Sequence, residues 1–223
     1  MESAQETQNT VVKLTILYSV ELEIQRAQSA VKKIPWYVAN GYGESFAKLP
    51  EGITKASNDE AIAKAVRSEY SEDEYVKFVA NLQKEWTDIP SGFEKMKEEP
   101  TLHLESEYEV MLTKYGSGGS YDLEKNRVII RINRNLQEGI VPVVVHEITH
   151  MTIQYLIDQY KVRQWHKERL VDLLLEQYFP GLKKQQNIRE DVSMVDQAFE
   201  RFFPNMKGVV KSVGEYYGKT TGE

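Results

Sequence analysis

The chain has 223 residues, of which 41% are hydrophobic and 28% are charged, so it can bury a core and is not expected to be disordered. Its formal net charge of −6, with both signs mixed, argues against a nucleic-acid binder. The absence of cysteine excludes a disulfide scaffold, a thiolate zinc site and a cysteine nucleophile. Because residues 1–10 lack signal-peptide features and no apolar run suits a membrane span, we expect a cytoplasmic protein with no membrane partner.

Residues 11–34 carry apolar side chains at a spacing that fits a helix, although residues 12–24 also alternate as a strand would. Since a strand over that whole range would be long, we expect a helix, with a strand that gives way to a helix near Ser19 as the alternative. A loop rich in Gly and Pro follows. Ser57–Glu60 then cap a helix to about Tyr70, and Ser71 caps another whose apolar stripe comprises Tyr75, Phe78, Val79, Leu82 and Trp86.

The pattern changes after Pro90 and Pro100. Residues 101–115 favour extended structure, and residues 126–133 form a β run rich in branched side chains. The segment GSGG at 116–119 fits neither common phosphate-binding pattern, so we interpret it as the flexible tip of a hairpin that joins these two strands.

Helical patterns occupy the last third of the chain, at residues 141–160, 164–179, 190–203 and 208–217. The first of them is apolar nearly all round and carries Pro142 at its start, which indicates a central buried helix. We therefore expect an α+β fold with a mostly helical N-terminal region over residues 1–99. Residues 100–223 would form a second domain with C-terminal helices.

The segment HEITH, residues 146–150, is the strongest functional signal. On a helix His146 and His150 lie one turn apart on one face, so both rings can bind one ion at the distance of about 2.0–2.1 Å that zinc prefers. Glu147 lies about 100° further round, where it can reach a water on the metal but not bind as a third ligand. This is the H-E-x-x-H arrangement, with Glu147 as general base. The alternative is two core histidines that pair with a glutamate without any metal.

A catalytic zinc site needs a third protein ligand and one open position. A third histidine six residues after the second would indicate a metzincin, but that position is Leu156. The next helix offers Glu168, our first choice, with Glu176, Asp172 and His166 as alternatives. Glu168 follows His150 after 17 residues, enough for the first helix to end and the chain to return.

His146, Glu147 and His150, followed by Glu168 and Asp172, resemble the gluzincin clan of zinc metallopeptidases, the thermolysin-like group. The resemblance covers about residues 100–180. It implies a zincin-like catalytic core, with Zn²⁺ bound by His146, His150 and Glu168, and Asp172 orienting one of the histidines. The chain departs from the clan around Glu168, where Lys167 and Arg169 replace the usual neighbours.

The resemblance implies hydrolysis of peptide bonds in a peptide or protein substrate, with metalloendopeptidase and aminopeptidase both open. It also implies that an extended peptide pairs with the strand at 127–133. A donor to the developing oxyanion would come from downstream, and the candidates are His166, Arg169, Tyr216 and Tyr217. Two other functions stay open: a non-catalytic protein that keeps the fold and the zinc, and a zinc hydrolase of other substrates. The sequence does not indicate an oligomeric state.

Overall fold

The computed structural model describes residues 3–6, 11–87, 89–132, 139–182, 187–188 and 190–219. The chain forms two compact units whose segments alternate along the sequence. Unit 1 comprises Met1–Asn9, Lys13–Trp86 and Glu107–Val144, and unit 2 comprises Thr10–Val12, Thr87–Ser106 and Val145–Glu223. This division differs from the expected one into residues 1–99 and 100–223, because strands from both ranges pair in the sheet of unit 1.

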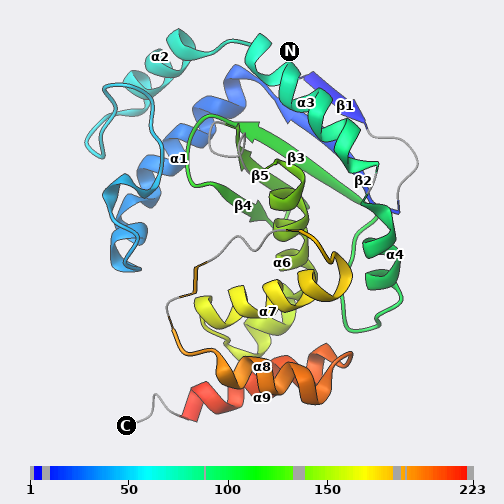
Figure 1. Cartoon of the computed structure of the whole chain (residues 1–223). Helices are drawn as coiled ribbons and strands as arrows, with labels where there is room; N and C mark the ends of the chain where they lie inside the picture. Colours follow the sequence, from blue (N-terminus) through cyan, green and yellow to red (C-terminus); the bar gives the residue numbers. More distant parts are fainter. Residues whose placement is uncertain are drawn as a thin grey trace. The chain divides into compact units, whose positions relative to one another are not determined.

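The sheet of unit 1 has five strands, labelled in Figure 1, in the order β1-β2-β3-β5-β4. They are β1 (Ser3–Glu6), β2 (Lys13–Tyr18), β3 (Glu107–Thr113), β4 (Gly119–Asp122) and β5 (Arg127–Arg131). The inner pairs β2–β3 and β3–β5 are parallel, and β1 and β4 add antiparallel edges. The expected α+β class is thus confirmed.

Side chains from the three inner strands form apolar rows across both faces of this sheet. On one face, Ile16, Val110 and Val128 stand in register and are fully buried. On the other face, the cluster of Leu17 and Met111 packs against Leu22 of the following helix. Because successive strand residues point to opposite faces, burial of both sets explains why apolar residues follow one another directly at 16–18 in β2 and 110–112 in β3.

The expectation of a single helix over residues 11–34 is wrong, and the strand-then-helix alternative is correct. The strand β2 ends at Tyr18, and the helix α1 runs over Val20–Ala39. Ser19 caps α1, since its hydroxyl accepts a hydrogen bond from the backbone N–H of Leu22 at 3.2 Å. A helix could not provide the backbone pairing with β3 that buries residues 13–18 in the sheet.

The expected hairpin between residues 101–115 and 126–133 is also wrong. The strands β3 and β5 are parallel, and the glycine-rich connection supplies β4, which pairs antiparallel with β5. As a result β5 has a neighbour on each side, so residues 127–131 do not offer the open edge that peptide pairing requires.

The loop at 116–119 is held by a buried arginine of α1, which contradicts its interpretation as a flexible tip. The Arg26 guanidinium donates hydrogen bonds to the hydroxyls of Ser117 at 3.3 Å and Ser120 at 3.1 Å. Gly116 has a φ of 85° and lies against the same guanidinium, where a Cβ atom would collide with it. The positive φ therefore favours glycine at this position, and a Cβ atom would also force the Arg26 guanidinium to move.

The remaining helices of unit 1 confirm the sequence pattern. A 3₁₀ turn, η1 (Glu44–Phe46), lies in the expected loop and precedes α2 (Asp59–Glu69) and α3 (Asp73–Trp86). The Asn58 side chain caps α2 by accepting from the backbone N–H of Ala61 at 2.8 Å. All five residues of the predicted stripe on α3 are buried.

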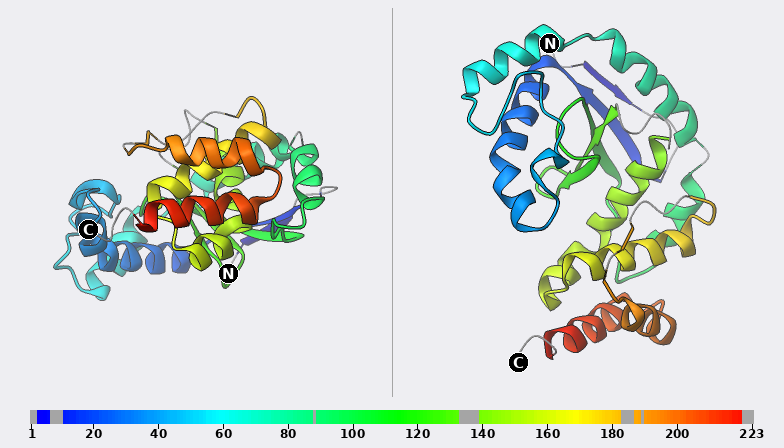
Figure 2. Two further views of the ribbon diagram at one scale, coloured as in Figure 1. Left: turned by 90° about the horizontal axis from the view of Figure 1, so that it is seen from below. Right: turned by 60° about the vertical axis from the view of Figure 1, so that its left-hand side comes forward.

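Unit 2 is helical in its described residues, and its elements are α4 (Pro90–Lys97), most of α6 (Val141–Tyr160), α7 (Gln164–Tyr178), α8 (Ser193–Phe202) and α9 (Met206–Lys219). Phe93 of α4 packs its ring on Phe179 at the end of α7, with ring centroids 4.8 Å apart. The helices α8 and α9 contact each other and lie side by side in the left view of Figure 2. In the described part of the chain, no helix is long and apolar enough to cross a membrane.

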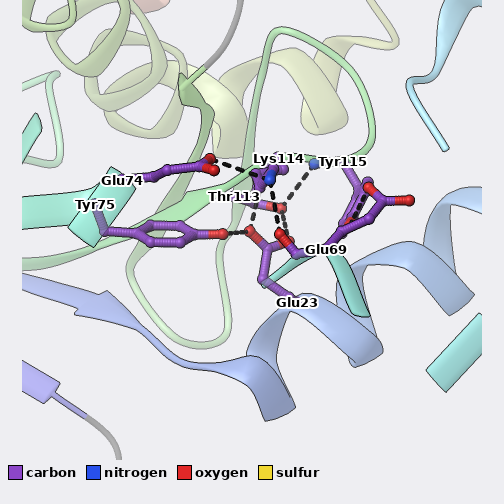
Figure 3. Close-up of polar contacts among 7 residues, drawn as sticks. All are labelled: Glu23, Glu69, Glu74, Tyr75, Thr113, Lys114 and Tyr115. Carbon is purple, nitrogen blue, oxygen red and sulfur yellow. Dashed lines mark hydrogen bonds and ion pairs between the residues drawn. The ribbon is translucent and has the colours of Figure 1, made fainter. Parts of the chain in front are cut away.

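Glu23 of α1 is a buried carboxylate on which two other elements of unit 1 converge (Figure 3). It accepts hydrogen bonds from the Tyr75 hydroxyl on α3, from the Thr113 hydroxyl at 2.6 Å and from the Lys114 backbone N–H at 2.7 Å. The Lys114 ammonium in turn pairs with Glu74 of α3 at 3.1 Å. Burial raises the pKa of the Glu23 carboxyl, although the three hydrogen bonds offset part of that effect.

We predict that Glu23 makes the stability of the protein depend on pH. Because its pKa is raised on folding, its contribution to stability is present when it is protonated and is lost as the pH rises through the folded-state pKa. As the pH rises above about 4.5, the ordinary pKa of a glutamate, the wild type should therefore lose stability relative to Glu23→Gln.

Urea-unfolding midpoints at several pH values measure this difference. Glu21→Gln, at an exposed position of the same helix, is the control and should follow the wild type. Parallel midpoints for the wild type and Glu23→Gln would contradict the assignment.

Candidate metal centre

The HEITH motif lies on α6 among apolar side chains that are buried on nearly every face of the helix. Val145, Ile148 and Ile153 are fully buried, and so is Thr149. The Thr149 hydroxyl donates to the Val145 carbonyl at 2.8 Å, so this polar side chain satisfies its hydrogen bond within the helix. The predicted bounds of this helix, residues 141–160, agree with the structure.

A tight connection turns the chain from α6 into α7. Lys161 adopts a positive φ of 53°, and the backbone N–H of Val162 donates to the Ile157 carbonyl at 3.1 Å, which closes the end of α6. The helix α7 begins at Gln164, only four residues after α6 ends at Tyr160. Glu168 consequently lies in the second turn of α7, close to the motif.

His146, His150 and Glu168 bring three ligand atoms together in unit 2. The two Nε2 atoms are 2.9 Å apart, and the Oε2 atom of Glu168 lies 3.1 Å from Nε2 of His150 and 3.4 Å from Nε2 of His146. All three side chains are buried, with residue exposures of 1%, 3% and 4%. Among the described residues, these three side chains form a group that could hold a metal ion.

These distances fit one small cation. Ligand atoms that lie about 2.0–2.1 Å from a tetrahedral ion are about 3.3–3.4 Å from one another, close to the separations of the three atoms here. Two imidazole nitrogens and one carboxylate oxygen are also donors that divalent transition metals accept. Glu168 is thus placed where the sequence analysis expected the third ligand.

The electrostatics of the group favour one added positive charge. Burial lowers the pKa of His150 to about 4, since the nearby Glu168 carboxylate offsets only part of the desolvation. Burial acts in the same direction on His146, but the hydrogen bond to Glu168 and the charges of Glu147, Glu168 and Asp172 outweigh it and raise the pKa of His146. Burial also disfavours the charged form of Glu168, yet the two histidines lower its pKa overall. The carboxylates around His146 therefore favour a positive charge at this point, which a bound cation would also supply.

Glu147 is buried and directly follows His146 in the chain, but it does not supply one of the three ligand atoms. This agrees with its expected position about 100° from His146 around the helix. Its negative charge helps to raise the pKa of His146 and opposes the burial that lowers the pKa of Lys167.

The other candidates for the third ligand lie elsewhere. Glu176 is exposed and faces Arg169 at 3.8 Å. His166 is buried under the ring of Tyr217, with centroids 3.6 Å apart, and its Nε2 atom faces Glu190 at 3.6 Å. His166 and Glu168 thus have different surroundings, as their offset of about 200° along the helix requires.

Asp172 is buried, and its charge helps to raise the pKa of His146. The Nδ1 atom of His146 has no hydrogen-bond partner among the described residues. The expectation that Asp172 orients a histidine through a hydrogen bond therefore stays a prediction for the metal-loaded protein.

All four candidate oxyanion donors make structural contacts, and those of His166 are given above. The Tyr217 hydroxyl donates to the Asp191 carbonyl at 3.0 Å, and its ring covers His166. Arg169 donates to the Asp196 carboxylate at 2.6 Å. Tyr216 is exposed and packs edge-on against Tyr217.

Gln164 is a member of this region that the sequence analysis did not single out. Its amide donates to the Oε1 atom of Glu168 at 2.6 Å, while Oε2 of the same carboxylate faces the two histidines. The signal in the sequence is the spacing of four residues between Gln164 and Glu168, which places them on one face of a helix.

Comparison of the chain with protein-family models, with curated proteins and with solved structures finds no match. The resemblance to gluzincins stays an expectation that depends on residues of α6 and α7. The HEITH motif and the position of Glu168 carry it.

We predict that the protein binds about one divalent transition-metal ion per chain and that His146→Ala or His150→Ala abolishes this binding. Loss of either imidazole leaves two protein ligands, too few for a stable site. Elemental analysis after dialysis against zinc measures the content. His103→Ala is the matched control, because His103 is an exposed histidine that stacks on Tyr155. Equal metal content in the His103 and His146 variants would contradict the assignment.

Proposed function

We propose that the protein is a zinc-dependent peptidase with a zincin-like catalytic core. The observation that carries the proposal is the convergence of His146, His150 and Glu168 on one buried point, with the buried Glu147 next to His146 in the chain and its charge acting on that histidine. The sequence resembles the gluzincins, and gluzincins bind zinc with the same donor set of two imidazoles and one carboxylate.

The number of protein ligands supports catalysis over a purely structural role. Structural zinc sites are usually closed by four protein ligands and often use cysteine, which this chain lacks. Among the described residues, the group here offers three ligand atoms, which leaves a position for water or substrate. A structural site also has no need of a buried carboxylate such as Glu147 next to a ligand.

The protein's own side chains then divide the reaction between them. Zinc, when bound, would lower the pKa of a coordinated water to near neutral and polarise the substrate carbonyl. Glu147 accepts the proton as the water attacks and passes it to the departing amine. His146, His150 and Glu168 hold the ion, and the apolar residues of α6 keep bulk water away from the charges. An extended peptide bound to β5 is not part of this proposal, since both neighbours of β5 are strands.

We predict that Glu147→Gln keeps the zinc and lowers the rate of peptide hydrolysis by about 10²–10⁴-fold, the usual contribution of a general base. The measurement is the cleavage rate of an unfolded protein substrate at equal zinc content. Glu176→Gln, an exposed glutamate of α7 outside the group, is the control and should cleave like the wild type.

Two outcomes would overturn the proposal. Hydrolysis by Glu147→Gln at the wild-type rate would remove Glu147 from the mechanism. A zinc-loaded wild type that cleaves no peptide would indicate a non-catalytic zinc protein or a hydrolase of other substrates.

A further inference from the structure

We propose that Gln164 is a positioning residue that restricts Glu168 to a single metal-binding oxygen. This inference rests on the proposed function, because it concerns how the third ligand binds the ion. It assigns a role to a side chain that does not itself touch the metal or the substrate.

The two oxygens of Glu168 have different partners. Oε2 lies 3.1 Å from Nε2 of His150 and 3.4 Å from Nε2 of His146, so it faces the candidate metal position. Oε1 accepts a hydrogen bond from the Gln164 amide at 2.6 Å. A hydrogen bond to a charged carboxylate at this distance is short and about twice as strong as one between neutral groups.

The backbone fixes this arrangement. Gln164 is the first residue of α7 and Glu168 follows one turn later, so the two side chains lie on the same face of the helix. Glu168 is 4% exposed, which leaves its carboxylate little contact with water. Without the amide, Oε1 would lose this hydrogen bond. It could then bind the metal ion that Oε2 already holds.

The number of oxygens that Glu168 supplies decides how open the centre is. Two histidines and one oxygen give three protein ligands, and the fourth position of a tetrahedral ion is left for water or substrate. If both oxygens bound while the water stayed, the ion would be five-coordinate and the water would no longer occupy the open position of a tetrahedral centre. The Gln164 amide therefore acts on the reaction through Glu168, by keeping Oε1 occupied.

The chain contains a second pair of the same kind for comparison. On α6, Gln154 donates to the Asp158 carboxylate at 2.7 Å, also one turn away, at an exposed site outside the group of three. Gln154→Met therefore removes the same kind of hydrogen bond as Gln164→Met. It serves as a matched control for general effects on helix stability.

The test replaces zinc with Co²⁺ in the full chain, because four-coordinate Co²⁺ absorbs visible light more strongly than five-coordinate Co²⁺. We expect the wild type and Gln154→Met to show the intense band. Gln164→Met should lose most of that intensity, as Glu168 becomes free to bind through both oxygens. The Kd for zinc should rise about tenfold or more, as is usual when the partner of a metal ligand is removed.

An unchanged Co²⁺ band in Gln164→Met would overturn the inference, whatever happens to the Kd, and would leave the zinc centre intact. A wild type that binds no Co²⁺ or Zn²⁺ would overturn both the proposed function and this inference. Gln164→Ala provides a second variant without the amide, and circular dichroism reports which variants are folded. If Gln164→Met does not fold, the Co²⁺ band of folded Gln164→Ala tests the role of the amide instead.

Discussion

The candidate site depends on one constraint, which is that two imidazoles and a carboxylate are buried against one another. Such groups are costly to remove from water unless a cation or a complete set of hydrogen bonds compensates. The arrangement around His146, His150 and Glu168 is consistent with a cation. The pKa of His146 is raised because the carboxylates of Glu168, Glu147 and Asp172 favour a positive charge at this point.

Two helices of unit 2, α6 and α7, meet that constraint together. The helix α6 is apolar on nearly every face, which keeps the two histidines dry. The turn at Lys161 returns the chain within four residues, so Glu168 reaches the motif from the second turn of α7. Gln164 then holds the oxygen of Glu168 that does not face the histidines. In unit 1 the carboxylate of Glu23 is also buried, but it accepts three hydrogen bonds from protein groups. These hydrogen bonds account for its burial without a bound ion.

Features set by local spacing could be predicted from the sequence, and features set by distant pairing could not. The bounds of α6 and the convergence of His146 and His150 follow from helical period alone. The parallel pairing of β3 with β2 and β5 depends on partners far apart in the chain, so a hairpin was the natural but incorrect expectation. The choice of Glu168 over Glu176 depended on its distance along the chain from His150, because one helical face carries both residues. Gln164 was missed because its role depends on which carboxylate oxygen it contacts.

The most direct test of the account is X-ray absorption at the zinc edge of the zinc-loaded wild-type protein. The account predicts a first shell of nitrogen and oxygen atoms at about 2.0–2.1 Å, with the outer-shell scattering of two imidazole rings. A shell of oxygen atoms without imidazole scattering would contradict it, because the ion would then lie away from His146 and His150.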